Sequence, residues 1–269
     1  MKKIINAILT FLLIILVFGL TILVITKQTI LNEQFVMKKI ESISYYEKIT
    51  NSLRESFKNN IIQSGIEVEF ADRLVDENKI KNDINGVIHS IYSGTDYKVT
   101  TNELTDKLNT RIDEIFDERN VVKTKSDEQS IVEFLDIISD TYITEINIIS
   151  GSHDILNKVV NKVNSYLPVL SIVLAVSIGL IFIIMLAVNK NIRFLSITFL
   201  TNFLLFWATY IFVHYNINIE NIKIFTDEFS LLLRAIMNGY VNIYLYASIA
   251  YFVFGLGNTI FTMDAEKKY

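Results

Sequence analysis

Residues Ile4–Ile25 read IINAILTFLLIILVFGLTILVI, a run of 22 residues without a charged side chain. Lys2 and Lys3 precede this run, and Lys27 follows it. At about 1.5 Å of rise per residue, a helix of this length crosses the hydrocarbon core of a bilayer, which is about 30 Å thick. The stretch therefore predicts a membrane-spanning helix near the start of the chain.

A cleaved signal peptide is the competing interpretation, because it also combines basic residues with an apolar segment. However, the run exceeds the usual length of about 7–15 residues for the apolar region of such a peptide. The small-x-small pattern of a cleavage site is missing from Thr21–Thr26, TILVIT. We therefore expect an uncleaved signal anchor over residues 1–26.

Three further apolar stretches have the length of membrane spans: 167–188, 194–213 and 239–261. Pro168, the only proline in the sequence, is expected to mark the start of the second span, where a missing N–H breaks no hydrogen bond. Residues 189–193, NKNIR, are all that separate the second span from the third. These two helices are therefore expected to be antiparallel neighbours.

Lysine and arginine near the spans predict the orientation, because short cytoplasmic loops are enriched in both. With four spans, three basic pairs fall on one side of the membrane: Lys2 with Lys3, Lys190 with Arg193, and Lys267 with Lys268. The connection 214–230 on the other side contains one lysine and three acidic residues. We therefore expect a multi-pass protein of the cell membrane with both termini in the cytoplasm and residues 27–166 outside.

Residues 27–166 are expected to form an all-helical extracytoplasmic domain. They contain 17 Lys and Arg against 24 Asp and Glu, a net charge of −7, whereas the whole chain has −4. Helix starts are indicated by the capping boxes Thr100–Glu103 and Ser126–Gln129 and by Asp76, and helix ends by Gly65, Gly94 and Gly151. We expect helices at 32–63 with a break near 42–44, at 67–75, 77–92, 101–118 and 127–150, and at 153–165 with continuation through Pro168 into the second span. The predicted fold class is all-α, a four-helix transmembrane bundle with an all-helical extracytoplasmic domain.

Arg234 interrupts the apolar approach to the fourth span. We interpret residues 214–238 as an outer loop with an interfacial amphipathic segment, in which Arg234 anchors to headgroups, followed by the span at 239–261 and a cytoplasmic tail at 262–269. The alternative is an intramembrane charge on a substrate path.

Small and polar residues within the spans predict helix contacts. Ser171, Ala175 and Gly179 recur every four residues in the second span, a face that favours close helix packing. Asn202 in the third span, and Asn238 with Asn242 in the fourth, are expected to make intramembrane polar contacts, with Asn202 bonding across to the fourth span. A conduction path lined by these residues is the alternative.

No motif indicates catalysis, a cofactor or a bound metal. His89, His153 and His214 are far apart and none has the spacing of a zinc-binding helix, and the chain contains no cysteine. We therefore expect no enzyme activity, although a membrane enzyme without a local motif remains a third class of function.

Five short segments carry a resemblance: LNEQFV at 31–36, SYYEKI at 44–49, QSGI at 63–66, KNDI at 81–84 and IYSG at 91–94. They resemble uncharacterised four-span membrane proteins of low-GC Gram-positive bacteria, which have a helical extracytoplasmic domain between spans one and two. The resemblance covers the first span and the front half of the outer domain. It implies topology and location, and it supplies no functional residues.

These patterns favour a bacterial cell-envelope protein that serves as a partner-binding accessory, scaffold or sensor subunit. The expected partners are the lipid bilayer and another envelope protein or a second copy, and no nucleic acid is expected for an acidic chain. The alternative is a small transporter or channel whose path is lined by polar residues of the third and fourth spans.

Overall fold

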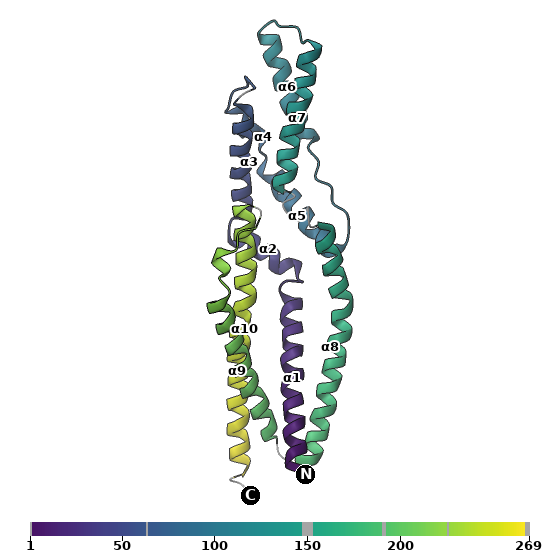
Figure 1. Cartoon of the computed structure of the whole chain (residues 1–269), viewed down its shortest axis with the longest axis vertical. Coiled ribbons are helices and arrows are strands. Elements are labelled where there is room, and N and C mark those ends of the chain that lie inside the picture. Colours follow the sequence, from purple (N-terminus) through teal and green to yellow (C-terminus); the bar gives the residue numbers. More distant parts are fainter. Residues whose placement is uncertain (1, 63, 147–152, 190–191, 225, 267–269) are drawn as a thin grey trace. The chain divides into compact units, whose positions relative to one another are not determined.

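The computed structural model describes residues 2–62, 64–146, 153–189, 192–224 and 226–266, and all regular elements in these ranges are helices (Figure 1). In chain order they are α1 (Lys2–Gln28), α2 (Glu33–Ser42), α3 (Tyr45–Ile61), α4 (Phe70–Leu74), α5 (Glu77–Ser93), α6 (Asn102–Glu118), α7 (Lys125–Ile146), α8 (His153–Asn189), α9 (Arg193–Asn216), the short 3₁₀ helix η2 (Ile219–Asn221) and α10 (Asp227–Glu266). The all-α fold class is therefore confirmed. The expected helix stop at Gly151 and part of the hairpin at 189–193 lie outside the described residues.

Four helices are long and apolar enough to cross a membrane. Their spanning segments are Lys2–Gln28 in α1, Asn157–Val188 in α8, Arg193–Asn216 in α9 and Asp227–Met263 in α10. The chain is therefore a multi-pass membrane protein. The arrangement of the spans as one four-helix bundle, and the side on which each end lies, stay predictions.

Two long helices each extend well beyond the expected limits of a span. Helix α8 runs from His153 to Asn189 with Pro168 inside it. The expected continuation of the 153–165 helix through Pro168 is therefore confirmed, and Pro168 does not mark a helix start. A proline is tolerated within a spanning helix because neighbouring groups and local backbone adjustments compensate for its missing N–H. Helix α10 likewise runs unbroken over the expected interfacial segment and the expected fourth span.

The chain divides into two compact units. The first, here called the span unit, comprises Met1–Val36, Lys162–Ile222 and Leu233–Tyr269. The second, here called the head unit, comprises Met37–Asn161 and Lys223–Leu232. The head unit thus contains most of the segment expected outside the membrane together with the start of α10.

The head unit has a conventional apolar core. Ile49, Leu53, Phe57 and Ile61 recur every four residues along α3, and each is fully buried. Helices α5 and α7 pack against α3, and α6 packs against α7. The apolar stripe of α5 is also buried: Ile80, Ile84, Val87, Ile88 and Ile91. Each such side chain contributes about 1.5–3 kcal/mol through burial, and this is what holds the helices together.

Helix ends in the head unit follow local chemistry. The Asp76 side chain accepts hydrogen bonds from the backbone of Asn78 and Lys79, and Gly94 ends α5 with φ of 74°, so both predicted signals are confirmed. The predicted break near 42–44 is also present, with Ser44 at φ of 52°. The capping boxes were misplaced, because Thr101 rather than Thr100 precedes α6 and makes no side-chain cap.

Helix α1 organises the span unit by contributing to two apolar clusters. The first cluster joins Leu13 of α1 to Met185 of α8 and Phe194 of α9. The second joins Ile25 of α1 to Phe206 of α9 and Tyr244 of α10. The end of α8 and the start of α9 are therefore neighbours.

Candidate partner-binding groove

Helix α7 carries an apolar stripe that is buried along one half of the helix and open along the other. Ile138, Tyr142 and Ile146 in the second half are at most 4% exposed. In the first half, Ile131 and Phe134 are only half-buried, and Ile137 is 51% exposed. The stripe opens because α3 ends at Ile61, whereas the α6–α7 hairpin extends beyond that end (Figure 1).

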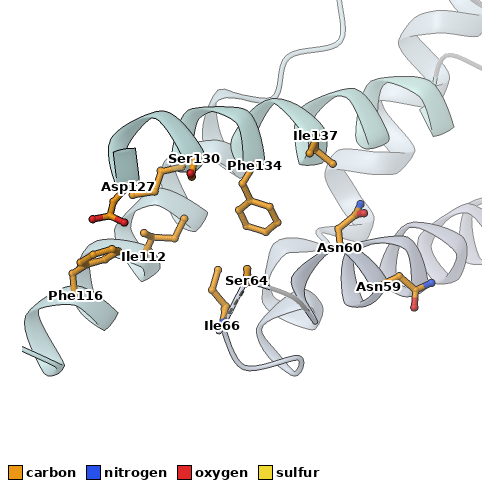
Figure 2. Close-up of a pocket in the computed structure, with 11 residues that line it drawn as sticks. Asn59, Asn60, Ser64, Ile66, Ile112, Phe116, Asp127, Ser130, Phe134 and Ile137 are labelled. Atoms are coloured by element: carbon orange, nitrogen blue, oxygen red, sulfur yellow. Dashed lines mark hydrogen bonds between the residues drawn. The ribbon is translucent and has the colours of Figure 1, made fainter. Parts of the chain in front are cut away.

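The open half of α7 forms one side of a cavity of about 530 Å³, here called the α3–α7 groove. Its apolar lining consists of Ile66, Ile112, Phe116, Ile131, Phe134 and Ile137, and its polar lining of Asn59, Asn60, Ser64, Asp127 and Ser130. In Figure 2 the Phe134 ring points from α7 into the space between Ile66 and Asn60. An apolar floor with a few polar groups at its edge is the usual composition of a binding site.

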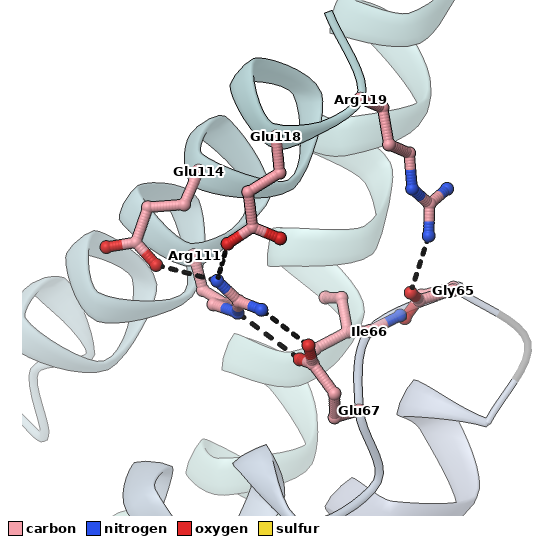
Figure 3. A network of polar contacts seen from close by, with 8 residues as sticks. Gly65, Ile66, Glu67, Arg111, Glu114, Glu118 and Arg119 are labelled. Carbon is pink, nitrogen blue, oxygen red and sulfur yellow. Dashed lines mark hydrogen bonds and ion pairs between the residues drawn. The ribbon is translucent and has the colours of Figure 1, made fainter.

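Ion pairs hold the loop after α3 in place as one wall of the groove. The Arg111 guanidinium on α6 donates to both carboxylate oxygens of Glu67, at 3.2 and 2.5 Å, and also to Glu114 and Glu118 (Figure 3). The Arg119 side chain donates to the carbonyl of Gly65, which has φ of 79°. These contacts fix Ile66, which lies between Gly65 and Glu67. Hydrogen bonding from Arg111 lowers the pKa of Glu67, so the pair is fully charged at neutral pH.

A capping box fixes the end of the groove at the start of α7. The Asp127 carboxylate accepts from the backbone N–H of Thr124 at 2.8 Å, and the Asp127 N–H donates to the Thr124 hydroxyl at 3.2 Å. Hydrogen bonds from Thr124 also lower the pKa of Asp127. The predicted box at Ser126–Gln129 was therefore wrong by two residues, because Thr124 with Asp127 satisfies the same reciprocal pattern.

The side of α7 next to the groove is acidic. Helix α7 contains six acidic residues and a single lysine, Lys125. Glu133 and Asp140 lie four residues before and three residues after Ile137, and therefore beside it on the helix surface. Among the described residues, no Lys or Arg forms an ion pair with either carboxylate, although Glu133 accepts from the Gln129 amide at 3.1 Å.

A buried carboxylate, Asp83 on α5, ties three elements of the head unit together. It accepts from the Tyr97 hydroxyl at 2.7 Å, the Tyr142 hydroxyl at 2.6 Å and the Lys79 ammonium at 3.0 Å. Burial and these contacts raise the pKa of Tyr97 to about 12 and raise that of Tyr142 further. Through these three donors, Asp83 joins α5 to the connection before α6 and to α7. No local motif identifies it, since its tyrosine partners are 14 and 59 residues away.

Glu145 near the end of α7 is a carboxylate in an unfavourable setting. It accepts one long hydrogen bond of 3.4 Å from Ser52, and its other oxygen is buried with no hydrogen-bond partner among the described residues. Burial, and then the negative charge of Glu228, raise the pKa of Glu145. The ionised form of Glu145 therefore opposes folding.

The small-residue stripe of α8 has no close neighbour at Gly179. Nothing lies within 4 Å of the position that a Cβ would take there, and Ala175 is exposed. The close approach between α1 and α8 instead involves Gly19 and Leu174. A tight helix contact along Ser171, Ala175 and Gly179 therefore stays a prediction.

The three asparagines of the spans do not come together. Asn202 is fully buried, and its amide donates to the carbonyl of Thr198 at 2.9 Å and to that of Ile14 on α1 at 3.5 Å. Its cross-helix partner is therefore α1 and not the fourth span. The Asn238 amide donates to Glu220, and Asn242 is exposed.

Two polar contacts of α10 were not anticipated. The Asn258 amide donates to the Ser196 hydroxyl at 2.8 Å and joins α10 to α9. The Arg234 guanidinium donates twice to the carbonyl of Ile222, at 3.0 and 2.9 Å. Arg234 thus fixes the connection that precedes α10, whereas an anchor to headgroups was expected. The sequence marked it as a charge at a helix end but gave no sign of a backbone partner.

No group of three or more His, Cys, Asp or Glu suited to a metal ion occurs among the described residues. His214 packs against the Tyr210 ring with centroids 5.6 Å apart, and the side chain of His153 lies outside the described residues.

The chain was also compared with known proteins. No protein-family model, no curated protein and no solved structure matches it.

Proposed function

We propose that this protein is a membrane-anchored binding subunit whose head unit holds a second protein in the α3–α7 groove. It serves there as an accessory, scaffold or sensor subunit of a bacterial cell envelope, with the head unit outside and both termini in the cytoplasm. The observation that carries the proposal is the open half of the α7 stripe, where Phe134 and Ile137 extend the apolar core without a cover.

Energetics supports this assignment. Ile138 is fully buried, whereas the neighbouring Ile137 side chain is 51% exposed because no helix covers it. A partner that covers the groove gains about 25 cal/mol for each Å² of apolar surface removed from water. The rigid walls formed by Arg111, Glu67 and the Thr124 cap mean that little ordering is needed on binding.

Site-specific photocrosslinking in living cells tests the proposal. The photoreactive residue p-benzoylphenylalanine replaces Ile137 in the groove or, as a matched control, Val132, which is 58% exposed and does not line the groove. We expect a defined protein adduct from position 137, absent from position 132 and reduced at least fivefold when Phe134→Ala is added. Identical adducts from both positions would contradict the proposal.

A transporter is the second candidate, favoured by a cavity of about 550 Å³ within the span unit. Residues of α1, α8 and α9 line it, including Thr10, Met185 and Arg193. Potassium or chloride flux into proteoliposomes that is blocked by Thr10→Phe, which fills the cavity, would favour transport. Flux equal to that of empty vesicles would remove this candidate.

A further inference from the structure

The groove also indicates what kind of protein segment it receives, an inference that rests on the proposed function. The groove, whose apolar side chains on α7 are Ile131, Phe134 and Ile137, follows α7 from Asp127 to Ile137. At about 1.5 Å per residue this is about 15 Å, or three turns of a helix laid alongside. A helix-in-groove complex presents apolar residues at three- and four-residue spacing to such a stripe.

The charge of the surrounding helices indicates which charged side chains the partner helix carries on its polar face. Residues 102–146, which comprise α6, α7 and their connection, contain 12 acidic and 5 basic residues, a net charge of −7. Most of the basic groups are already engaged within the unit: Lys107 with Glu103, Arg111 with three glutamates, Lys123 with Asp113, and Arg119 with the Gly65 carbonyl. An acidic partner would therefore meet repulsion with few cations left to pair.

The same charges disfavour two other occupants. A second copy would bring an identical acidic hairpin against the first, and like charges brought together at an interface are unfavourable. An anionic lipid surface attracts basic segments and repels acidic ones. Lysine and arginine on the occupant would instead pair with Glu133 and Asp140, which flank the groove beside Ile137 and have no ion pair among the described residues.

We propose that the α3–α7 groove binds an amphipathic helix of about three turns from another envelope protein, with its apolar face on Phe134 and Ile137 and a lysine- and arginine-rich polar face toward Glu133 and Asp140.

The absence of native cysteine allows a direct test with the full chain. Ser130→Cys places a polarity-sensitive fluorophore in the groove, and Val132→Cys places the same label on another face of α7. The labelled protein, in nanodiscs of zwitterionic lipid, is titrated with a 14-residue leucine–lysine amphipathic peptide. Its controls are a leucine–glutamate peptide of the same pattern and a leucine–lysine peptide in scrambled order.

We expect the leucine–lysine peptide to shift the emission at position 130 but not at 132, with at least tenfold tighter binding than either control. The affinity falls as salt is raised, and Glu133→Gln with Asp140→Asn weakens it about tenfold while thermal unfolding is unchanged. Equal binding of the leucine–glutamate or the scrambled peptide overturns the inference.

Failure of the inference is distinguishable from failure of the proposed function. If no peptide binds at position 130 but the photocrosslink at Ile137 persists, the groove is a docking site for a partner of different chemistry. If both the peptide response and the crosslink are missing, neither proposal stands.

Discussion

The head unit and the span unit differ in the polar side chains that they bury and in the apolar side chains that they expose. In the head unit the most buried positions are apolar, such as Ile49 and Phe57, both 0% exposed. In the span unit several of the most buried positions are polar, including Thr198 at 1% and Asn202 at 0%, whereas Ile172 and Ile183 are more than 60% exposed. The span unit thus combines buried polar side chains with apolar side chains that face outward.

The difference follows from the solvent. In water the burial of apolar surface drives helix association, whereas lipid tails are as apolar as leucine and give no such force between spans. Spanning helices associate through packing and hydrogen bonds instead. An isoleucine is therefore a stability determinant in the head unit and, where it faces outward in α8, only a contact with lipid.

The largest test of this contrast exchanges one residue type in both units. Ile49→Ala removes a fully buried side chain and is expected to destabilise the head unit by about 2–5 kcal/mol. Ile183→Ala, at a position 64% exposed, is expected to change stability by less than about 0.5 kcal/mol. Hydrogen–deuterium exchange of α3 and α8 in nanodiscs measures both. Similar losses at the two positions would show that α8 is covered by another chain.

A glycine pair sharpens the comparison at a smaller scale. At Gly86 an added Cβ would lie 2.4 Å from the Tyr97 ring, so Gly86→Ala must displace the ring that donates to Asp83. We expect a loss of about 1–3 kcal/mol. Gly179→Ala meets nothing within 4 Å and is expected to be neutral or to stabilise by up to about 1 kcal/mol. Thermal unfolding measures both changes in stability. A loss of stability in Gly179→Ala would instead support a helix partner on that face of α8.

The buried amide of the span unit gives the third test. Asn202→Ala removes hydrogen bonds to Thr198 and Ile14 and is expected to cost about 0.5–1.5 kcal/mol. Asn242→Ala, at an exposed position, is the matched control with no expected change. Fluorescence of Trp207, the single tryptophan and part of α9, reports unfolding of this unit. A larger loss of stability in Asn242→Ala than in Asn202→Ala would mean that a partner contacts Asn242.

The smallest expected effect depends on pH. Because the folded-state pKa of Glu145 is raised, its stabilising protonated form is fully present below the unfolded pKa and is lost as pH rises through the folded value. Glu145→Gln should therefore stabilise the head unit at pH 7 by up to about 1 kcal/mol, with no gain below about pH 4. Melting temperatures at the two pH values measure this, with Glu128→Gln as control. A gain that persists at low pH would exclude the electrostatic cause.

Local sequence signals predicted much of the fold and little of the groove. The charge-free runs identified the four spanning helices, and Asp76 and Gly94 bounded α5 because caps depend on neighbouring residues only. Pro168 lies inside α8, as the expected continuation required, and not at a helix start, because the effect of a proline depends on what surrounds the helix. The groove could not be predicted, since it exists only because α3 ends before α7 does. Its residues, from Asn59 to Ile137, meet through tertiary packing that no spacing rule encodes.

The contact of Asn202 with the Ile14 carbonyl also has a consequence for biogenesis. Its two residues are 188 positions apart, and α1 leaves the ribosome long before α9. When the less apolar α9 is released into the bilayer, the helix that accepts its amide is already there. Synthesis in the opposite order, as in a circular permutant that begins at α8 and ends with α1, would leave this amide with only its bond to Thr198 until translation is complete. Such a permutant is expected to insert less efficiently, even though its folded contacts are the same.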